Sequence, residues 1–208
     1  MKPKQDAWTV VIAGCWNRMI FMPKWVSENL FDVSEIQKLV PIMPIAPLIY
    51  RTDEISLFVE DQKLVFQARQ ATMECLQKVE SMAVTALDKL PVTPVSAVGV
   101  NFGFVEDAPS ERLLKLFNFG DDVDIGMLGW EIGTRNLVRQ LTRGEAILNL
   151  RLSSDSKEVE IHVNFHEDVA SASGAVNSIK GKVVNRYEEC KKLIAEVYGL
   201  RAEEEKKS

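Results

Sequence analysis

The chain has few of the residues on which recognisable site chemistry depends. It contains 208 residues but only two histidines and three cysteines. Cys15, Cys75 and Cys190 are odd in number and far apart, so we expect reduced thiols in a cytoplasm and no disulfide framework. No two of them have the close spacing of zinc ligands.

Long apolar runs are also missing. No stretch approaches the roughly 20 apolar residues that a membrane-spanning helix needs. Residues 1–8 are polar and do not resemble a signal peptide. The longest apolar run, 39–50, contains Pro41, Pro44 and Pro47. We interpret this run as a rigid edge segment packed on the domain, with a polyproline II ligand as the alternative. We therefore expect a cytoplasmic protein with no membrane partner.

The motifs of several common enzyme classes are absent. There is no Gly-Lys-Ser/Thr phosphate loop, no Gly-x-Ser-x-Gly elbow and no dinucleotide-binding fingerprint. His162 and His166 lie four residues apart, which on a strand is about 13 Å and too far for one zinc ion. A pair of Cys15 or Cys75 with His162 stays open, but nothing in the sequence brings these side chains together. We expect no catalytic residue, no metal and no cofactor.

The remaining composition is that of an ordinary globular protein. Hydrophobic residues make up 46% and charged residues 26%, which excludes a disordered or fibrous chain. In the first half, the patterning predicts a strand at 9–16, a short helix at 23–31, up to four short strands near 36–43, 47–52, 55–60 and 63–69, and a long helix at 72–90. In the second half, it predicts a strand at 95–104, a helix at 109–117, strands near 134–142, 146–153 and 158–166, and a long helix at 173–198.

The two halves repeat one order of elements: strand, short helix, several antiparallel strands, long helix. The short helices also correspond, residues 22–31 with residues 108–117. We interpret this as an internal duplication, with halves at 1–92 and 93–200 and a charged flexible tail at 201–208. Two unrelated α+β pieces are the alternative.

This order resembles the duplicated β-α-β4-α unit of the TATA-binding-protein-like fold. The resemblance implies an α+β protein whose two β-α-β(3-4)-α halves form one curved antiparallel sheet with long helices on one face. The basic, wedge-bearing pattern of the DNA-binding members is not recognisable, so no functional residue is carried over. The segment TPVSAVGVNF, residues 93–102, is similar to a strand in a family of uncharacterised bacterial proteins of similar length. The helix-grip fold, one sheet around a long C-terminal helix, is the main alternative.

Polar residues gather on one face of the strands expected in the second half. Strict alternation separates a leucine-rich core face from a face with Asn149, Arg151, His162 and Asn164. Arg139 alternates with the core leucines and would join the polar face only at an edge or a bulge. The polar face has the groups to bind a carboxylate, a phosphate or a partner strand. A solvated antiparallel face is the alternative.

The negative charge is concentrated in one segment. Residues 104–131 hold seven acidic and two basic side chains, and this difference equals the whole net charge of -5. Residues 120–133, which we call the acidic loop, combine Asp121, Asp122 and Asp124 with Trp130. An acidic loop with an exposed Trp suits docking to a basic protein surface. A strand extension that buries Trp130 is the alternative.

These features predict a non-enzymatic binding or complex-assembly protein. Its expected surfaces are the open sheet face and the acidic loop, and its expected partner is another protein or a second copy of the chain. Nucleic-acid binding by the sheet face, with Arg139 and Arg151, is one alternative, because a net charge of -5 still leaves a local basic face open. An enzyme or carrier that uses His162 or Arg151 on an acidic small molecule is the other.

Overall fold

One large antiparallel sheet organises the chain. The computed structural model describes residues 1–33, 36–39, 46–155 and 157–203. Over these residues the sheet has ten strands in the order β3-β4-β5-β6-β2-β7-β10-β9-β8, with β1 also paired to β7. Every pair is antiparallel. The strands are β1 (Lys2–Pro3), β2 (Thr9–Gly14), β3 (Gln37–Leu39), β4 (Leu48–Arg51), β5 (Ile55–Val59), β6 (Lys63–Ala68), β7 (Val95–Glu106), β8 (Arg135–Arg143), β9 (Ala146–Ser154) and β10 (Val159–Asp168).

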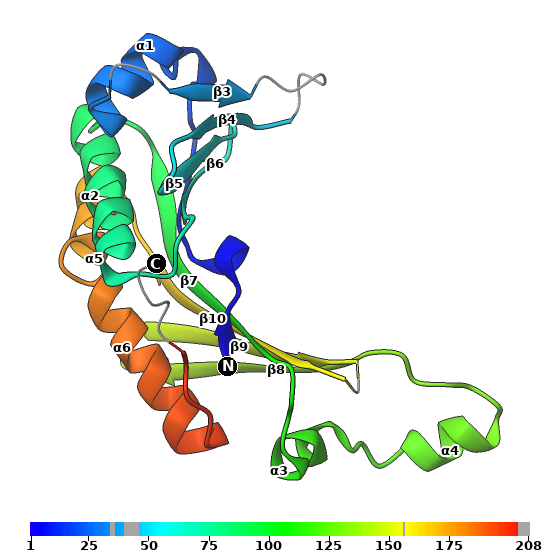
Figure 1. Cartoon of the computed structure of the whole chain (residues 1–208). Coiled ribbons are helices and arrows are strands. Elements are labelled where there is room, and N and C mark those ends of the chain that lie inside the picture. The colour runs from blue at the N-terminus through cyan, green and yellow to red at the C-terminus, as the bar shows by residue number, and fades with distance from the viewer. Residues whose placement is uncertain (34–35, 40–45, 156, 204–208) are drawn as a thin grey trace.

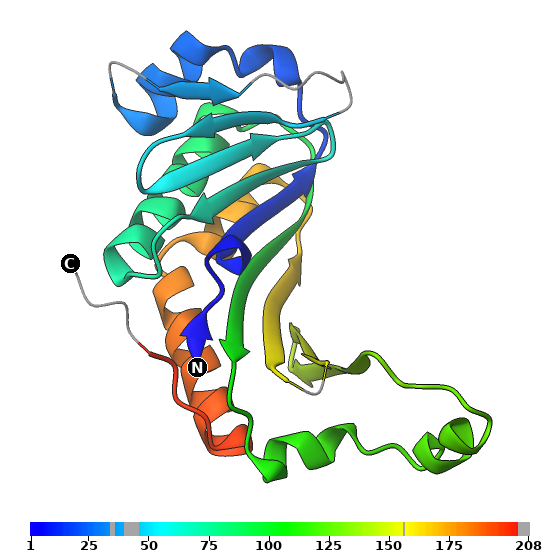
Figure 2. The same ribbon diagram turned by 45° about the vertical axis from the view of Figure 1, so that its right-hand side comes forward.

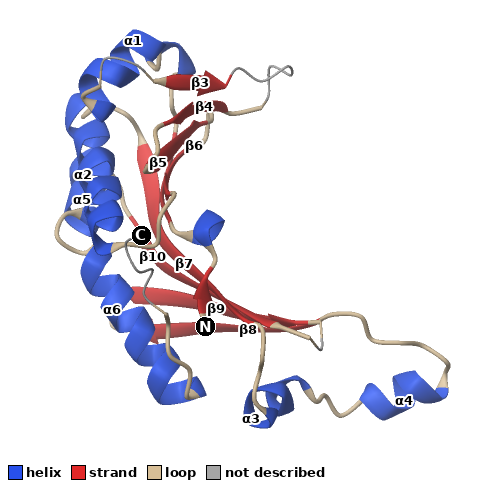
Figure 3. Cartoon of the chain, in the orientation of Figure 1, coloured by secondary structure: helices blue, strands red, loops and turns tan. Residues whose placement is uncertain are grey.

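A helical layer lies along one face of the sheet, as Figures 1 and 3 show. It consists of α2 (Met73–Lys89), α5 (Ala172–Ile179) and α6 (Val183–Leu193), and α6 continues into the π-helical turn η5 (Ile194–Tyr198). The remaining helical segments are η1 (Gln5–Ala7), η2 (Arg18–Ile20), α1 (Pro23–Val26), η3 (Ser27–Phe31), α3 (Glu111–Leu114), η4 (Lys115–Phe117) and α4 (Asp122–Met127). The protein is therefore a mixed α+β protein with one extensive sheet, as the sequence predicts.

The central strand β7 buries one of its two faces along residues 98–104. Val98, Val100, Phe102 and Phe104 point toward the helices and are at most 1% exposed. Phe102 packs against both Trp8 and Tyr187, with ring centroids 5.6 Å and 5.5 Å away. Burying side chains of this size stabilises the fold by about 2 kcal/mol each. This aromatic cluster joins the sheet to α6.

The strands of the second half agree with the sequence pattern to within two residues at each end. The long helix predicted at 72–90 is also confirmed as α2, and the Thr72 side chain caps its start by accepting a hydrogen bond from the Cys75 N–H. Of the strand predicted near 36–43, residues 37–39 form β3 and residues 40–43 lie outside the described residues. Pro41 and Pro44 lie outside them as well, so the predicted edge segment stays a prediction.

The prediction of one continuous helix over 173–198 is wrong. Gly181 adopts a φ of 71° in the left-handed region, which ends α5 and lets α6 start in a new direction. The Glu80 carboxylate of α2 accepts hydrogen bonds from the backbone N–H groups of Gly181, at 2.8 Å, and Val183, at 2.9 Å. A carboxylate at a helix start satisfies free N–H groups and favours the helix dipole. The helical layer thus contains α2 beside a broken C-terminal helix, which differs from the helix-grip alternative.

Replacing Glu80 with alanine is expected to lower the free energy of unfolding by about 1–2 kcal/mol, because two N–H groups at the start of α6 lose their acceptor. Urea unfolding followed by circular dichroism measures the change. The control Asp88→Ala removes an exposed carboxylate from the same helix and should change the free energy by less than about 0.5 kcal/mol. Equal losses in the two variants would contradict the capping role.

Candidate functional site: the open sheet face and the acidic loop

The sheet face opposite the helical layer carries a continuous row of polar side chains. This face is left uncovered by α2, α5 and α6 (Figure 2). Strand register places one polar residue directly opposite the next on β2, β7, β10, β9 and β8. We call these five residues the polar row: Thr9, Asn101, Asn164, Asn149 and Gln140.

The amides of the polar row bond to one another head to tail. Asn101 Nδ2 donates to Thr9 Oγ1 at 2.9 Å, and Asn164 Nδ2 donates to Asn101 Oδ1 at 2.8 Å. Asn149 Nδ2 donates to Asn164 Oδ1 at 3.0 Å, and Gln140 Nε2 donates to Asn149 Oδ1 at 3.2 Å. An amide has two N–H groups, and each of these bonds uses one. The row is therefore ordered, and its second N–H groups remain for a bound molecule or for water.

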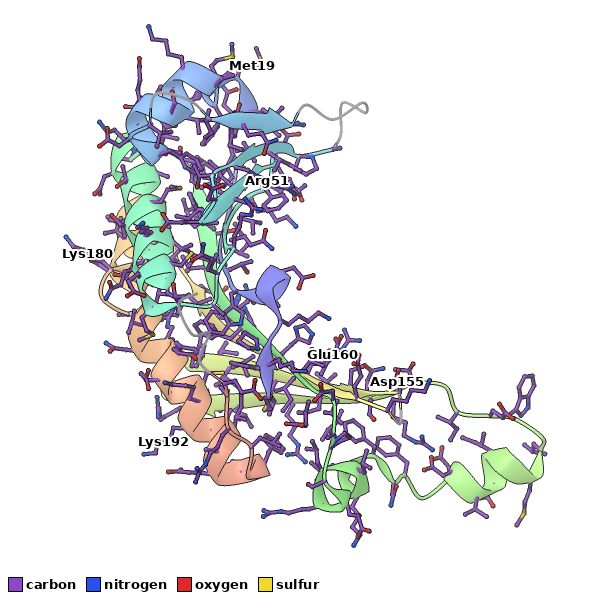
Figure 4. The ribbon with its side chains drawn as sticks, viewed as in Figure 1. Met19, Arg51, Asp155, Glu160, Lys180 and Lys192 are labelled. Carbon is purple, nitrogen blue, oxygen red and sulfur yellow. The ribbon has the colours of Figure 1, made fainter. Side chains whose placement is uncertain are left out.

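A charged cluster lies beside the polar row. Glu160, labelled in Figure 4, forms an ion pair with Lys4 and lies 3.2 Å from Nε2 of His162. The Lys4 hydrogen bond, followed by that of His162, holds the pKa of the Glu160 carboxyl below its ordinary value. The cluster joins the N-terminal segment to β10 and leaves His162 partly exposed.

Arg151 is the one candidate on this face whose charge is not neutralised within the described part of the chain. Its Nε and Nη2 donate to Asn136 Oδ1 at 3.2 Å and 2.9 Å, and Ser153 donates to the same oxygen. Because Asn136 is neutral, these bonds orient the exposed guanidinium and leave its positive charge available.

A shallow depression of about 330 Å³ lies over these residues, and its lining includes Asn101, Asn149, Asn164, Arg151 and His162. Gly103 allows Ala7, which also lines the depression, to lie close to β7, since a Cβ at residue 103 would lie 2.4 Å from the Cβ of Ala7. The structure thus brings four of the predicted site residues together: Asn149, Arg151, His162 and Asn164.

Arg139 does not join this group. It faces Leu150 in the register of β8 and β9, on the side of the sheet that the helices cover. Its Nη1 lies 3.5 Å from the hydroxyl of Tyr198 in η5. The nucleic-acid alternative requires Arg139 to lie beside Arg151, and this placement is therefore wrong. Arg139 lies where strict alternation along the strand puts it.

The acidic loop projects away from the body of the protein (Figures 1 and 2). Asp122 anchors it, because its Oδ2 accepts from Arg135 Nη2 at 3.2 Å and from the Phe119 N–H at 3.3 Å. The loop contains the short helix α4, of which no residue is buried. Asp121 and Asp124 are exposed. The strand extension considered above is wrong.

Four large apolar side chains on this loop face solvent. The exposed fractions are 65% for Val123, 80% for Met127, 77% for Leu128 and 71% for Trp130. Single exposed apolar residues are common on proteins, whereas four on one projecting segment are unusual. The alternative in which Trp130 is buried is therefore wrong.

The described residues contain no group of three or more His, Cys, Asp or Glu side chains arranged to hold a metal ion. His166 lies 3.0 Å from Asp168 and thus has a different carboxylate partner from His162. Cys75 lies on α2, buried on the helical side, and donates to the Glu54 carbonyl, so the structure separates it from His162. Within the same residues, no helix has the length and apolar character needed to span a bilayer.

Sequence alternation identified the polar face but not the polar row. Asn101 and Gln140 also follow the alternation of their strands, but alternation carries no information about which residues face each other across strands. No pattern in the sequence marks Thr9 or Lys4 as part of the site, because their roles depend on contacts with β7 and β10.

Comparison with models of known protein families gave no match, and neither did comparison with curated proteins. The interpretation of the site therefore depends on its geometry.

Replacing Asn164 with alanine interrupts the polar row at its centre. We expect a loss of about 1 kcal/mol in the free energy of unfolding, because two side-chain hydrogen bonds disappear and water replaces them only in part. Unfolding in a urea titration measures this loss in the free energy of unfolding. Gln140→Ala, at the exposed end of the row, is the control and should cost less than about 0.5 kcal/mol. An Asn164→Ala effect no larger than the control would show that the row does not stabilise the sheet.

Glu160 predicts a pH-dependent contribution to stability. Its pKa is lowered from the ordinary value of 4.5 in the folded state, so its contribution is present above that value and is lost as the pH falls through the folded-state pKa. Glu160→Gln should therefore destabilise the protein near pH 7, by no more than about 1 kcal/mol for this partly exposed pair. The difference from wild type should shrink near pH 3, about a unit or more below the ordinary pKa. A difference that stays constant across this range would argue against the ion pair.

Proposed function

We propose that this protein is a non-enzymatic assembly protein that docks to another protein through its acidic loop. One observation carries the proposal: Val123, Met127, Leu128 and Trp130 are all largely exposed on a projecting acidic segment. Leaving such side chains in water forfeits roughly 1.5–3 kcal/mol each relative to burial. A partner that covers them would recover part of that free energy.

The chemistry of the loop defines its partner. Trp and Met are enriched at the energetic centres of protein interfaces, and charged groups at the rim guide association. Asp121, Asp124 and Glu131 are exposed around the apolar side chains. The matching surface is an apolar groove with a basic rim, on another protein or on a second copy of the chain. The anchor at Asp122 holds the loop at its base and reduces the entropy that docking costs.

The open sheet face is a second surface in this proposal, and its polar row suits hydrogen bonding to a partner backbone. Nucleic acid is a poorer occupant. Arg139 lies on the other side of the sheet and Lys4 is paired with Glu160, which leaves Arg151 as the unneutralised cation among the candidate residues. Nucleic-acid affinity depends on several phosphate contacts.

We also propose that the two halves are related by duplication, as in the TATA-binding-protein-like fold. The order of the strands supports this. Apart from the two-residue strand β1, the first strand of each half pairs with the last strand of the same half, β2 with β6 and β7 with β10, and β2 and β7 pair with each other.

A reducing compartment such as the cytoplasm fits the thiols. Cys15 is exposed and Cys75 and Cys190 are buried, and all three are free.

The proposal is tested with the double variant Met127→Ala/Trp130→Ala. Wild-type protein purified from its native host is expected to associate with a partner or with itself, as measured by size-exclusion chromatography with light scattering. The double variant should weaken that association at least about 30-fold, the effect of losing one strong anchor of roughly 2 kcal/mol. Val92→Ser is the matched control, because Val92 is 93% exposed and lies outside the loop.

Two results would contradict the docking role. One is a wild-type protein that is monomeric and with which no partner co-purifies. The other is an association that the double variant leaves as strong as the control variant does.

A further inference from the structure

A second cavity lies on the opposite side of the sheet from the polar row. It has a volume of about 400 Å³ and opens between the ends of β8 and β9 and the helix α6. Leu141, Leu148, Phe165 and Leu193 contribute apolar surface to it. Its size is at the lower end of the range for sites that bind small molecules, and a mostly apolar lining with a few polar groups is typical of them.

Arg186 is the most unusual residue of this lining. Its side chain is only 9% exposed, and burial lowers the pKa of its guanidinium. One side of the group forms an ion pair with Glu167, and its Cζ lies 5.9 Å from the centre of the Phe165 ring. Nη1 is closed off from solvent and has no hydrogen-bond partner among the residues that the structure describes. A buried donor without an acceptor costs about 1–3 kcal/mol.

The remaining charges around the cavity leave it slightly positive. Arg143 pairs with Glu189, and Arg186 pairs with Glu167. Lys182 is exposed at the rim, and within the described part of the chain no ion pair involves it. Of the charged Arg, Lys, Asp and Glu side chains that line the cavity, three are basic and two are acidic. The uncompensated positive charge of this lining favours an anion.

We propose that this cavity binds a small amphipathic carboxylate, with its apolar body against Leu141, Leu148 and Phe165 and its carboxylate toward Arg186 and Lys182. A carboxylate beside Arg186 and Lys182 neutralises the excess positive charge at the rim, and charge-assisted hydrogen bonds to these groups are the strong ones. The ligand is expected to carry only one negative charge. A second negative charge would be repelled by the carboxylates of Glu167 and Glu189, with no cation left to compensate it. The proposal is independent of docking by the acidic loop.

The test is isothermal titration calorimetry with decanoate as the probe and decylamine as its counterpart of equal chain length and opposite charge. Wild-type protein is expected to bind one decanoate per chain, and at least about tenfold more tightly than decylamine. Absence of decanoate binding at concentrations up to about 5 mM would overturn the proposal, and so would equal affinity for the two probes.

Three variants test the position of the ligand. Leu141→Trp narrows the mouth of the cavity from a partly exposed position, and it should weaken decanoate binding at least about tenfold. Lys182→Glu should weaken binding about three- to tenfold by reversing the rim charge. Arg186→Met/Glu167→Gln removes both members of the buried pair, so neither partner is left charged and alone, and it should weaken binding at least about tenfold.

Matched controls complete the design. Lys180→Glu makes the same charge change two residues from Lys182, on an exposed side chain outside the cavity lining, and should leave the affinity within about twofold (Figure 4). Trp130→Ala should also leave it unchanged, since the acidic loop is not part of the site. Decanoate binding that survives Leu141→Trp, or that is lost in Trp130→Ala, would place the ligand elsewhere and overturn the proposal. If the buried-pair variant does not fold, Leu141→Trp and Lys182→Glu still decide the outcome.

Discussion

The burial of one face of β7 is the constraint on which the rest of the structure depends. Side chains alternate along a strand, so burying Val98, Val100, Phe102 and Phe104 against the helical layer directs Gly99, Asn101 and Gly103 to the open face. The register of β2 and β10 against this strand then places Thr9 and Asn164 on either side of Asn101. The polar row is thus a consequence of how the core is packed. The two glycines keep this face shallow, because a Cβ at either one would collide with a neighbouring side chain.

The open sheet face and the acidic loop differ in how far contacts within the chain already satisfy their exposed side chains. On the open face, amides bond to amides, and Glu160 has both Lys4 and His162 as partners. Such a face is stable in water without a partner. The acidic loop has no comparable compensation, since none of the residues of α4 is buried and Trp130 is 71% exposed. This contrast is why we assign docking to the loop first and to the sheet face second.

Local patterns predicted much of the fold, and contacts distant in sequence account for what they missed. Alternation located β8, β9 and β10, and it also placed Arg139 on the covered face. The helix break at Gly181 was missed because a long apolar stripe runs through it, and its capping group, Glu80, lies about a hundred residues away. The helix α4 was missed because Gly126 lies inside it and glycine disfavours helices. The site residues on the open face were found, but their alignment depends on strand register, which alternation does not determine.

The measurement that tests the central claim most directly is hydrogen–deuterium exchange of the acidic loop, in the free protein and in the complex isolated from its native host. The account predicts rapid exchange in the free protein, because α4 has no buried residue, and marked protection of residues 122–130 in the complex. Strand β9, which is hydrogen-bonded on both sides to β10 and β8, should exchange slowly in both states. A loop that exchanges as rapidly in the complex as in the free protein would contradict docking through this segment.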